Sequence, residues 1–322
     1  MAVYTDITDR ELATFLADFD LGRAITFKGI AEGVENSNFL LETGAGRYIL
    51  TLYERRARPE DLPFFLRLMG WLDHRGYPSA APITDRGGRV LKSIRGKPAA
   101  LIAFKSGISV RRPLPGHCAE AGKGLARLHL AAQGFPMRRF NDLGFGAWAA
   151  MAASLAPAAE LLEPGIASIL TDDLAMFARS WPVGIPAGII HADYFPDNVL
   201  FLEDRHSATI DFYFAAWDCL AYDIGIALNA WCFEDDGGFD AANATAFLHG
   251  YREIRPLSPE ETAALPILAW GAAMRFFLTR LADWKTTPPG ALVRPKDPLA
   301  YARRLATHRA GTGIDRLLGN AE

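Results

Sequence analysis

Residues 189–211 read IIHADYFPDNVLFLEDRHSATID, and this stretch decides most about the fold of the chain. It contains His191, Asp193 and Asn198 in the spacing H-x-D-x-x-x-x-N, and it ends on Asp211. Short apolar runs at 199–202 and 208–210 flank a polar segment, a pattern that predicts a β-hairpin. Antiparallel pairing would bring the residue that enters the hairpin close to the residue that leaves it.

The predicted hairpin would bring together side chains that can bind a metal ion and accept a proton. An amide oxygen from Asn198 and a carboxylate from Asp211 are ligands that suit Mg²⁺, which prefers hard oxygen donors. Asp193 lies on the loop before the hairpin, where it can accept the proton of an incoming hydroxyl, while His191 is expected to brace the loop. Together they predict a phosphoryl-transfer site.

A structural explanation competes with this one. Aspartate and asparagine collect in turns because they bond to their own backbone, and the segment 195–198 passes as an ordinary turn. Any one of these residues alone would more often be structural than catalytic. The complete set with apolar runs on either side favours a kinase-type site, within the false-positive risk of every motif.

The motifs resemble those of a known superfamily. HADYFPDN at 191–198 followed by IDF at 210–212 is similar to the aminoglycoside phosphotransferase and choline kinase superfamily, whose fold is like that of protein kinases. Further segments resemble the homoserine kinases built on that fold: NSNF at 36–39, YILTLYE at 48–54, IDFYFA at 210–215, YDI at 222–224 and NAWC at 229–232. The resemblance covers nearly the whole chain in order.

The resemblance implies an α+β, protein-kinase-like fold with two lobes. It also implies an enzyme that uses ATP and Mg²⁺ to phosphorylate the side-chain hydroxyl of L-homoserine, a step toward threonine. Asp193 and His191 are then the catalytic residues, and Asn198 and Asp211 hold the metal.

The composition agrees with a cytoplasmic enzyme that acts on a small molecule. The chain has 322 residues, of which 50% are hydrophobic and 22% charged, which is enough for a sizeable core. A net charge of −3 without a basic block gives no reason to expect nucleic acid as a partner. Three widely spaced cysteines predict no disulfide framework, and we expect neither a secretory signal nor a membrane-spanning run.

The pattern of elements changes along the chain. Capped helices and short strands predict a small nucleotide-binding lobe at 1–104, with a hairpin turned by DRGG at 85–88. Helical spacing then dominates 105–322, and the segment 199–210 is the one confident β region there. We expect the hinge at 105–107, and pockets often form at such junctions.

The residues predicted to bind the nucleotide come from one loop and from the hinge. The segment 29–38 joins two expected strands, and glycine and backbone N–H groups there suit phosphate binding. The residues predicted to bind nucleotide are Asn36, Ser37, Asn38, Phe104 and Lys105. Kinases of this fold place a cation in the third strand, whereas Thr51 occupies that place here, so Arg55, Arg56 or the metal ion would supply the charge.

Fewer sequence features identify the residues that would bind the acceptor alcohol. Homoserine carries a carboxylate, and Arg275 stands in an apolar helix where a buried guanidinium needs an anionic partner. An internal ion pair with Asp218 or Asp223 explains Arg275 at least as well. Tyr194, Asn229 and Trp231 are the other candidates, although Trp231 equally fits a buried helical stripe. Asp218 and Asp223 are expected to tie the catalytic loop to the helix that follows.

Three alternatives remain open from the sequence. The acceptor is another small alcohol, such as choline, an amino sugar or an aminoglycoside; or the site is a metallohydrolase; or the chain is a nucleotide-binding module with little turnover. The oligomeric state and any feedback regulation are not predicted.

Overall fold

The computed structural model describes residues 5–30, 36–54, 58–234, 236–287 and 295–319. The chain divides into two compact units. The first contains Met1–Gly107, Phe135–Met137 and Ser207–Tyr213, and the second contains Ile108–Gly134, Arg138–His206 and Phe214–Glu322. Asp211 therefore belongs to the first unit, while the loop that carries Asp193 belongs to the second.

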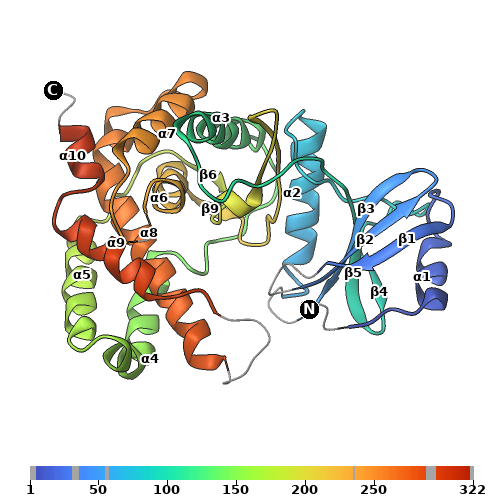
Figure 1. Ribbon diagram of the computed structural model, residues 1–322, viewed down its shortest axis with the longest axis horizontal. Helices are drawn as coiled ribbons and strands as arrows, with labels where there is room; N and C mark the ends of the chain where they lie inside the picture. The colour runs from blue at the N-terminus through green and yellow to red at the C-terminus, as the bar shows by residue number, and fades with distance from the viewer. Residues whose placement is uncertain (1–4, 31–35, 55–57, 235, 288–294, 320–322) are drawn as a thin grey trace. The chain divides into compact units, whose positions relative to one another are not determined.

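The first unit is built on a five-stranded antiparallel sheet. Its strands are β1 (Ala24–Gly29), β2 (Asn36–Thr43), β3 (Gly46–Tyr53), β4 (Lys92–Ile94) and β5 (Lys97–Ala103), in the order β1-β2-β3-β5-β4. Helix α1 (Asp9–Leu16) begins with a capping box between Thr8 and Glu11 and packs its apolar face on the sheet. Helix α2 (Leu62–His74) lies on the opposite side of the sheet (Figure 1).

One predicted hairpin is in the wrong place. The β4–β5 turn is formed by Arg95 and Gly96, both with positive φ, rather than by residues 85–88. A two-residue turn with positive φ at both residues matches the twist of the two antiparallel strands that it joins. Asp85 instead closes a separate turn, where its side chain accepts the backbone N–H groups of Gly87 and Arg89 at 2.8 and 2.9 Å.

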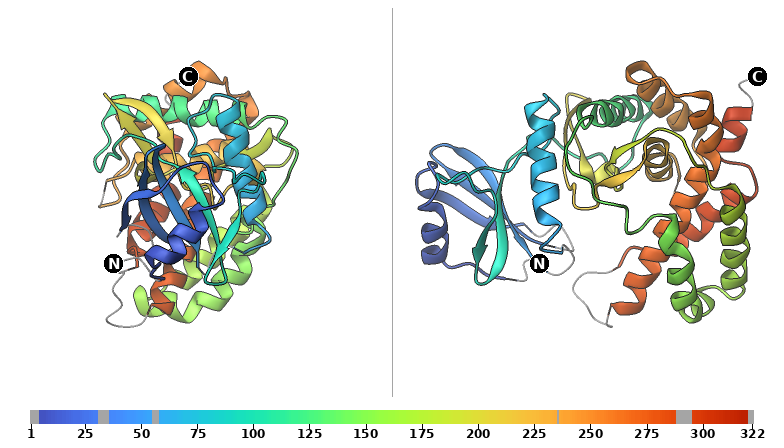
Figure 2. Two further views of the ribbon diagram at one scale, coloured as in Figure 1. Left: turned by 90° about the vertical axis from the view of Figure 1, so that its right-hand side faces the viewer. Right: turned by 180° about the vertical axis from the view of Figure 1, so that it is seen from behind.

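The second unit is mostly helical (Figure 2). Its helices are α3 (Pro115–Ala131), α4 (Phe145–Leu162), α5 (Ile166–Ser180), α6 (Leu220–Trp231), α7 (Ala241–Ile254), α8 (Pro259–Thr286), α9 (Leu299–Arg309) and α10 (Ile314–Gly319). Of these, α9 and α10 were not predicted. The prediction of an α+β chain with a small antiparallel sheet and a mostly helical remainder is confirmed.

Two short β-ribbons flank the catalytic loop. Strand β6 (Ala187–Ile190) pairs with β9 (Ala216–Cys219), a pairing that the sequence did not predict because the partners are short and far apart. Strands β7 (Val199–Leu202) and β8 (Arg205–Thr209) form the predicted hairpin. The hairpin turn is the pair Glu203 and Asp204, both with positive φ, so β8 begins earlier than expected.

Close helix packing frames the interior of the second unit. A Cβ atom on Gly122 of α3 would lie 2.1 Å from the Phe247 carbonyl oxygen of α7, and one on Gly250 of α7 would lie 2.1 Å from the Ala119 carbonyl oxygen. Only glycine fits at these two positions because the helix backbones touch there. This contact fixes α3 and α7 on one side of α6.

Helices α4 and α8 have long apolar stretches. Contrary to expectation, each contains a window long and apolar enough, by length and composition, to cross a membrane. In α8 67% of that window is buried inside the protein, whereas in α4 22% is buried. The α4 residues Trp148, Leu155, Ala158 and Ala159 join the same core as α8.

Candidate phosphoryl-transfer site

The catalytic loop runs from His191 to Asn198, between β6 and β7, and ends in the 3₁₀ turn η1 (Pro196–Asn198). Its second residue, Ala192, has a φ of +62°, a left-handed conformation that costs a residue with a side chain roughly 1 kcal/mol or more. Two side chains hold this residue in place. Its N–H donates to Asp223 Oδ1 at 2.9 Å, and its carbonyl oxygen accepts from Arg275 Nη1.

Asp223 of α6 is the main anchor of the loop. It is fully buried, and its carboxylate accepts the N–H groups of His191 and Ala192, while His129 Nε2 lies 3.1 Å from Oδ2. Burial by itself raises the pKa of the Asp223 carboxyl, but the His129 hydrogen bond and the His191 contacts bring it below its ordinary value. The prediction that Asp223 ties the loop to the next helix is confirmed.

Asp218 has a different role from the one expected. Its carboxylate accepts from Asn141 Nδ2 at 2.8 Å and from the Cys219 N–H at 2.7 Å. Burial raises the pKa of Asp218 above its ordinary value. These bonds join β9 to the segment before α4, so Asp218 supports the ribbon rather than the loop.

Asp193, His191 and Asn198 are brought together as the motif predicts. Asn198 Nδ2 donates to the Asp193 carbonyl oxygen at 2.9 Å and to Asp193 Oδ2 at 3.0 Å. Because both bonds use the amide nitrogen, Oδ1 is the Asn198 atom suited to a cation. His191 is fully buried, and its Nδ1 accepts the Asp193 N–H at 3.3 Å, which positions the aspartate.

Asp211 follows β8 in the first unit. It has a φ of +63°, and strained backbone of this kind clusters at functional sites. The tyrosines Tyr53 and Tyr213 join their hydroxyls at 2.9 Å. Burial, followed by the charge of Asp211 among other neighbours, raises the pKa of both phenols, so they stay protonated.

The predicted nucleotide residues on β2 are only partly supported. Ser37 is fully buried and donates its hydroxyl to Glu54 Oε1 at 2.6 Å, so its one hydroxyl proton is not available to a phosphate. Asn38 Oδ1 accepts from Thr51 Oγ1 at 2.8 Å, and Asn36 Oδ1 is buried without a hydrogen-bond partner. Residues 31–35 of the predicted phosphate loop, with Arg55 and Arg56, lie outside the described part of the chain.

The sequence did not reveal an ion pair at the end of β3. Lys97 of β5 pairs with Glu54 and also donates to Thr5 Oγ1 at 2.6 Å. Burial raises the pKa of Glu54, but hydrogen bonds from Lys97 and Ser37 lower it further than burial raises it. This ion pair joins β3 to β5 beside the position where a strand cation was expected.

The hinge residues also have partners within the first unit. The guanidinium carbon of Arg47 lies 4.4 Å from the centroid of the Phe104 ring. Lys105 Nζ lies 3.1 Å from Asp73 Oδ1 of α2. Phe104 and Lys105 remain candidates for nucleotide contact on the grounds of sequence position.

The four predicted acceptor residues are buried in the second unit. Tyr194 donates its hydroxyl to the Ala121 carbonyl oxygen at 3.0 Å, and Trp231 Nε1 donates to the Tyr194 carbonyl oxygen at 2.8 Å. Asn229 Nδ2 donates to the carbonyl oxygens of Gly225 and Ala269. Arg275 contacts the Ala192 carbonyl oxygen instead of Asp218 or Asp223. These contacts hold all four side chains inside the fold, and their part in acceptor binding stays a prediction.

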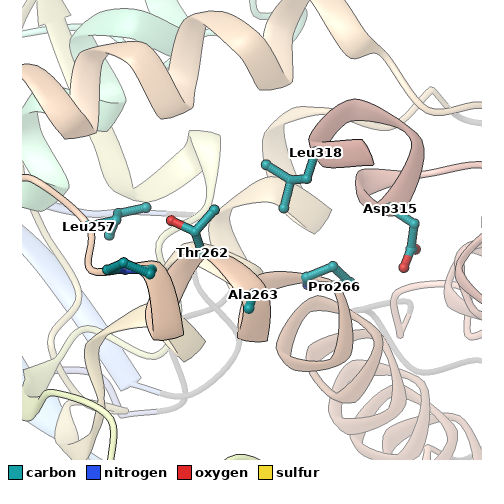
Figure 3. A pocket seen from close by; sticks show the side chains of 7 residues that line it. Leu257, Thr262, Ala263, Pro266, Asp315 and Leu318 are labelled. Carbon is teal, nitrogen blue, oxygen red and sulfur yellow. The ribbon is translucent and has the colours of Figure 1, made fainter. Parts of the chain in front are cut away.

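A separate hollow of about 630 Å³ lies between the start of α8 and α10 (Figure 3). It is lined by Leu257, Pro259, Thr262, Ala263, Pro266, Asp315 and Leu318. No residue of the catalytic loop contributes to it.

Comparison with known proteins gives a consistent result. The model of the phosphotransferase enzyme family matches residues 26–257. A homoserine kinase of Caulobacter sp. (strain K31) is 64% identical over 315 residues, which cover 98% of either chain. Homoserine kinases of Phenylobacterium zucineum and Xanthobacter autotrophicus are 64% and 53% identical, over 98% and 96% of this chain and 97% of each relative.

Solved structures share the fold at low sequence identity. An amicoumacin kinase in complex with AMP-PNP, Ca²⁺ and Ami has a TM-score of 0.68 at 14% identity, covering 98% of this chain and 94% of that one. A microcompartment-associated aminopropanol kinase has a TM-score of 0.66 at 17% identity, with coverages of 95% and 97%. The predicted kinase-like fold is confirmed by these neighbours.

Proposed function

Because this chain belongs to the phosphotransferase enzyme family and, within it, to the homoserine kinases, we propose that it phosphorylates L-homoserine with ATP. The γ-phosphoryl group passes to the side-chain hydroxyl and gives O-phospho-L-homoserine, an intermediate on the way to threonine. The observation that carries this proposal is the 64% identity to a homoserine kinase over 98% of the chain. We place the reaction in the cytoplasm.

Asp193 is proposed as the residue that accepts the hydroxyl proton. Phosphoryl transfer depends mainly on positioning and charge stabilisation, so the loop must hold this carboxylate in one place. The support is the set of bonds around it: Asn198 binds its carboxylate, His191 accepts its N–H, and Asp223 holds the preceding two residues.

Asn198 and Asp211 are proposed to hold Mg²⁺. The donor set fits because one amide oxygen and one carboxylate leave room for water and phosphate oxygens, as Mg²⁺ requires. The orientation of the Asn198 amide, with its nitrogen on Asp193, supports this assignment. An ion held there supplies positive charge to the β- and γ-phosphate oxygens. Asn36, Asn38, Phe104 and Lys105 are proposed as contacts of the nucleotide.

A panel of acceptors tests this function. The purified protein is mixed with ATP and Mg²⁺, and ADP release is followed with L-homoserine, choline, an amino sugar or an aminoglycoside. We expect kcat/KM for L-homoserine to exceed that of every other acceptor by at least tenfold, or roughly 1.4 kcal/mol of transition-state stabilisation. A higher kcat/KM for another alcohol would show that this alcohol, and not L-homoserine, is the substrate.

A further inference from the structure

Three arginines surround a stack of two aromatic rings in the second unit. Arg275 and Arg280 lie on α8 and Arg304 lies on α9, a helix that packs against α8 (Figures 1 and 2). The guanidinium carbons of Arg280 and Arg304 both lie 4.4 Å from the centroid of the Tyr301 ring, so they are at most twice that distance apart. The guanidinium of Arg275 lies 4.3 Å from the centroid of the Phe276 ring.

This aromatic stack begins in the catalytic loop. Phe195, two residues after Asp193, meets the Phe276 ring at a centroid distance of 4.9 Å. Phe276 in turn stacks on Tyr301 at 5.3 Å with an interplanar angle of 30°. The arginines on Tyr301 are therefore connected to the catalytic loop through two ring contacts.

Among the described residues, no carboxylate forms an ion pair with any of the three guanidinium groups. Arg280 Nη1 donates to the Asp297 carbonyl oxygen at 3.2 Å, and Arg275 donates to the Ala192 carbonyl oxygen. Arg304 is half-buried, but its Nε and Nη1 atoms and the Tyr301 hydroxyl are buried without a hydrogen-bond partner. Buried N–H groups of a cation that have no acceptor are costly, which points to a ligand that supplies the negative charge.

The electrostatics of neighbouring groups agree with this picture. Burial lowers the pKa of Arg280 and the charge of Arg304 lowers it further, while Tyr301, Asp297 and Asp193 act in the opposite direction. Burial and the Arg304 charge lower the pKa of His308 to about 3. Arg280 and Arg304 are therefore close enough to repel each other, and Asp193 is close enough to influence Arg280.

We propose that Arg280 and Arg304, together with the Tyr301 hydroxyl, bind the α-carboxylate of the amino-acid acceptor. This inference rests on the proposed function and adds the residues that select an amino acid over a simple alcohol. Guanidinium groups match carboxylates in shape and charge, often with two parallel hydrogen bonds. The acceptor is short, so its carboxylate must lie near Asp193 when its hydroxyl does. Arg275 braces the loop and is not part of this subsite.

The first experiment compares two acceptors that differ only in the carboxylate. Arg280→Met and Arg304→Met are assayed with L-homoserine and with 3-aminopropan-1-ol, which has hydrogen in place of the carboxylate. We expect KM for L-homoserine to rise on the order of 10²-fold with little change in kcat, because a remote contact contributes uniform binding. Turnover of 3-aminopropan-1-ol should stay within about threefold of the wild type, since it has no carboxylate to lose.

Arg303→Met is the matched control. Arg303 lies next to Arg304 on α9, is exposed, and its guanidinium is 3.9 Å from the Asp297 carboxylate. This variant removes the same charge from the same helix and should keep the wild-type KM. Thermal melts of all variants identify any that fail to fold. If Arg304→Met does not fold, Arg304→Lys takes its place, and we expect its KM for L-homoserine to lie between that of the wild type and the value expected for the methionine variant.

A binding measurement tests the carboxylate subsite independently of the phosphorylation reaction. L-2-aminobutyrate is homoserine without the hydroxyl, so its calorimetric affinity reports the subsite without turnover. Wild-type binding that Arg304→Met abolishes supports the subsite even if the enzyme prefers another hydroxyl compound. The subsite is overturned if the wild type does not bind this ligand, if both acceptors lose activity equally, or if the variants raise KM for ATP instead.

Discussion

Asp193 is held by two direct hydrogen-bond partners and by the anchoring of the residues before it. Asn198 binds its carboxylate, His191 accepts its N–H, and Asp223 accepts the N–H groups of His191 and Ala192. If Asp193 accepts the hydroxyl proton as proposed, the acceptor meets a carboxylate that is already oriented. Preorganisation of this kind supplies much of the rate in phosphoryl transfer.

Asp193→Asn should lower kcat by roughly 10²–10⁴, the usual contribution of a general base, with KM for ATP little changed. The amide can still accept the Asn198 hydrogen bond, so the loop should keep its shape. Steady-state kinetics with ATP and L-homoserine measure the effect. The control is Asp197→Asn in the same loop, an exposed residue 3.3 Å from Lys296 Nζ, which should keep normal turnover. Near-normal kcat in Asp193→Asn would remove this residue from the mechanism.

His308 gives a prediction about pH. Its pKa is lowered from 6.5 to about 3 by burial and by the Arg304 charge, so the folded protein keeps it neutral while the unfolded chain protonates it below pH 6.5. The unfolded state then binds the extra proton, and stability falls as pH drops, by up to about 1.4 kcal/mol per pH unit. His308→Gln should reduce this slope between pH 6 and pH 4, as measured by urea unfolding. His74→Gln, at an exposed histidine of α2, should keep the wild-type slope; equal slopes in all three proteins would contradict the prediction.

For single residues, the sequence predicted the contacts between residues that are close to one another along the chain. His191, Asp193 and Asn198 act together because their spacing within one loop sets their contacts. The hydrogen bond from Ser37 to Glu54 was not foreseen, since Glu54 follows another strand, and the part of Ser37 in nucleotide binding stays a prediction. The cluster of Arg280 and Arg304 on the Tyr301 ring was not predicted because it depends on how α9 packs on α8, which no local pattern reveals.

A polar network joins α3, α6, α7 and α8 under the catalytic loop. From Asp223 it passes to His129, whose Nδ1 lies 2.7 Å from the Tyr251 hydroxyl. Arg255 Nη1 donates to that hydroxyl at 3.2 Å, and Arg255 pairs with Glu261 of the α8 capping box at 2.9 Å. Since the arginine donates to the phenol oxygen, the phenol proton is directed to His129. The helices are thus joined by hydrogen bonds as well as by apolar packing.

Tyr251→Phe should destabilise the protein by about 1–3 kcal/mol, because it leaves His129 Nδ1 buried without a partner. The matched control is Tyr222→Phe in the same core, where the hydroxyl is buried and has no hydrogen-bond partner. That change should be neutral or stabilising, since it removes a buried polar group with no bond to lose. Urea unfolding of the two variants measures the difference, and an equal loss in both would contradict the network.

Elements with a strong local signal were predicted well. The capping boxes at Thr8 and Ser258 and the apolar spacing of the long helices mark α1 and α8 clearly. The ribbon β6–β9 and helix α9 were not predicted because their stability comes from partners distant in sequence. The β4–β5 turn was misplaced since Asp85 heads a genuine turn of its own.

The chain combines a unit built on a five-stranded sheet with a mostly helical unit that carries the loop of residues 191–198. Family resemblance and composition together predicted this class, the reaction and its substrate. The arginines proposed to bind the acceptor could not be predicted, since they come from α8 and α9 and only the folded chain brings them together.

Phosphorus NMR of the reaction mixture tests the central claim most directly. The protein is incubated with ATP, Mg²⁺ and L-homoserine, and the ³¹P signal of the product is examined for coupling to the protons of the substrate. The predicted result is a phosphomonoester coupled to the two hydrogens on the hydroxyl-bearing carbon, which Asp193→Asn forms roughly 10²–10⁴ times more slowly. Release of inorganic phosphate alone, or an unchanged ATP spectrum, would contradict transfer to the homoserine hydroxyl.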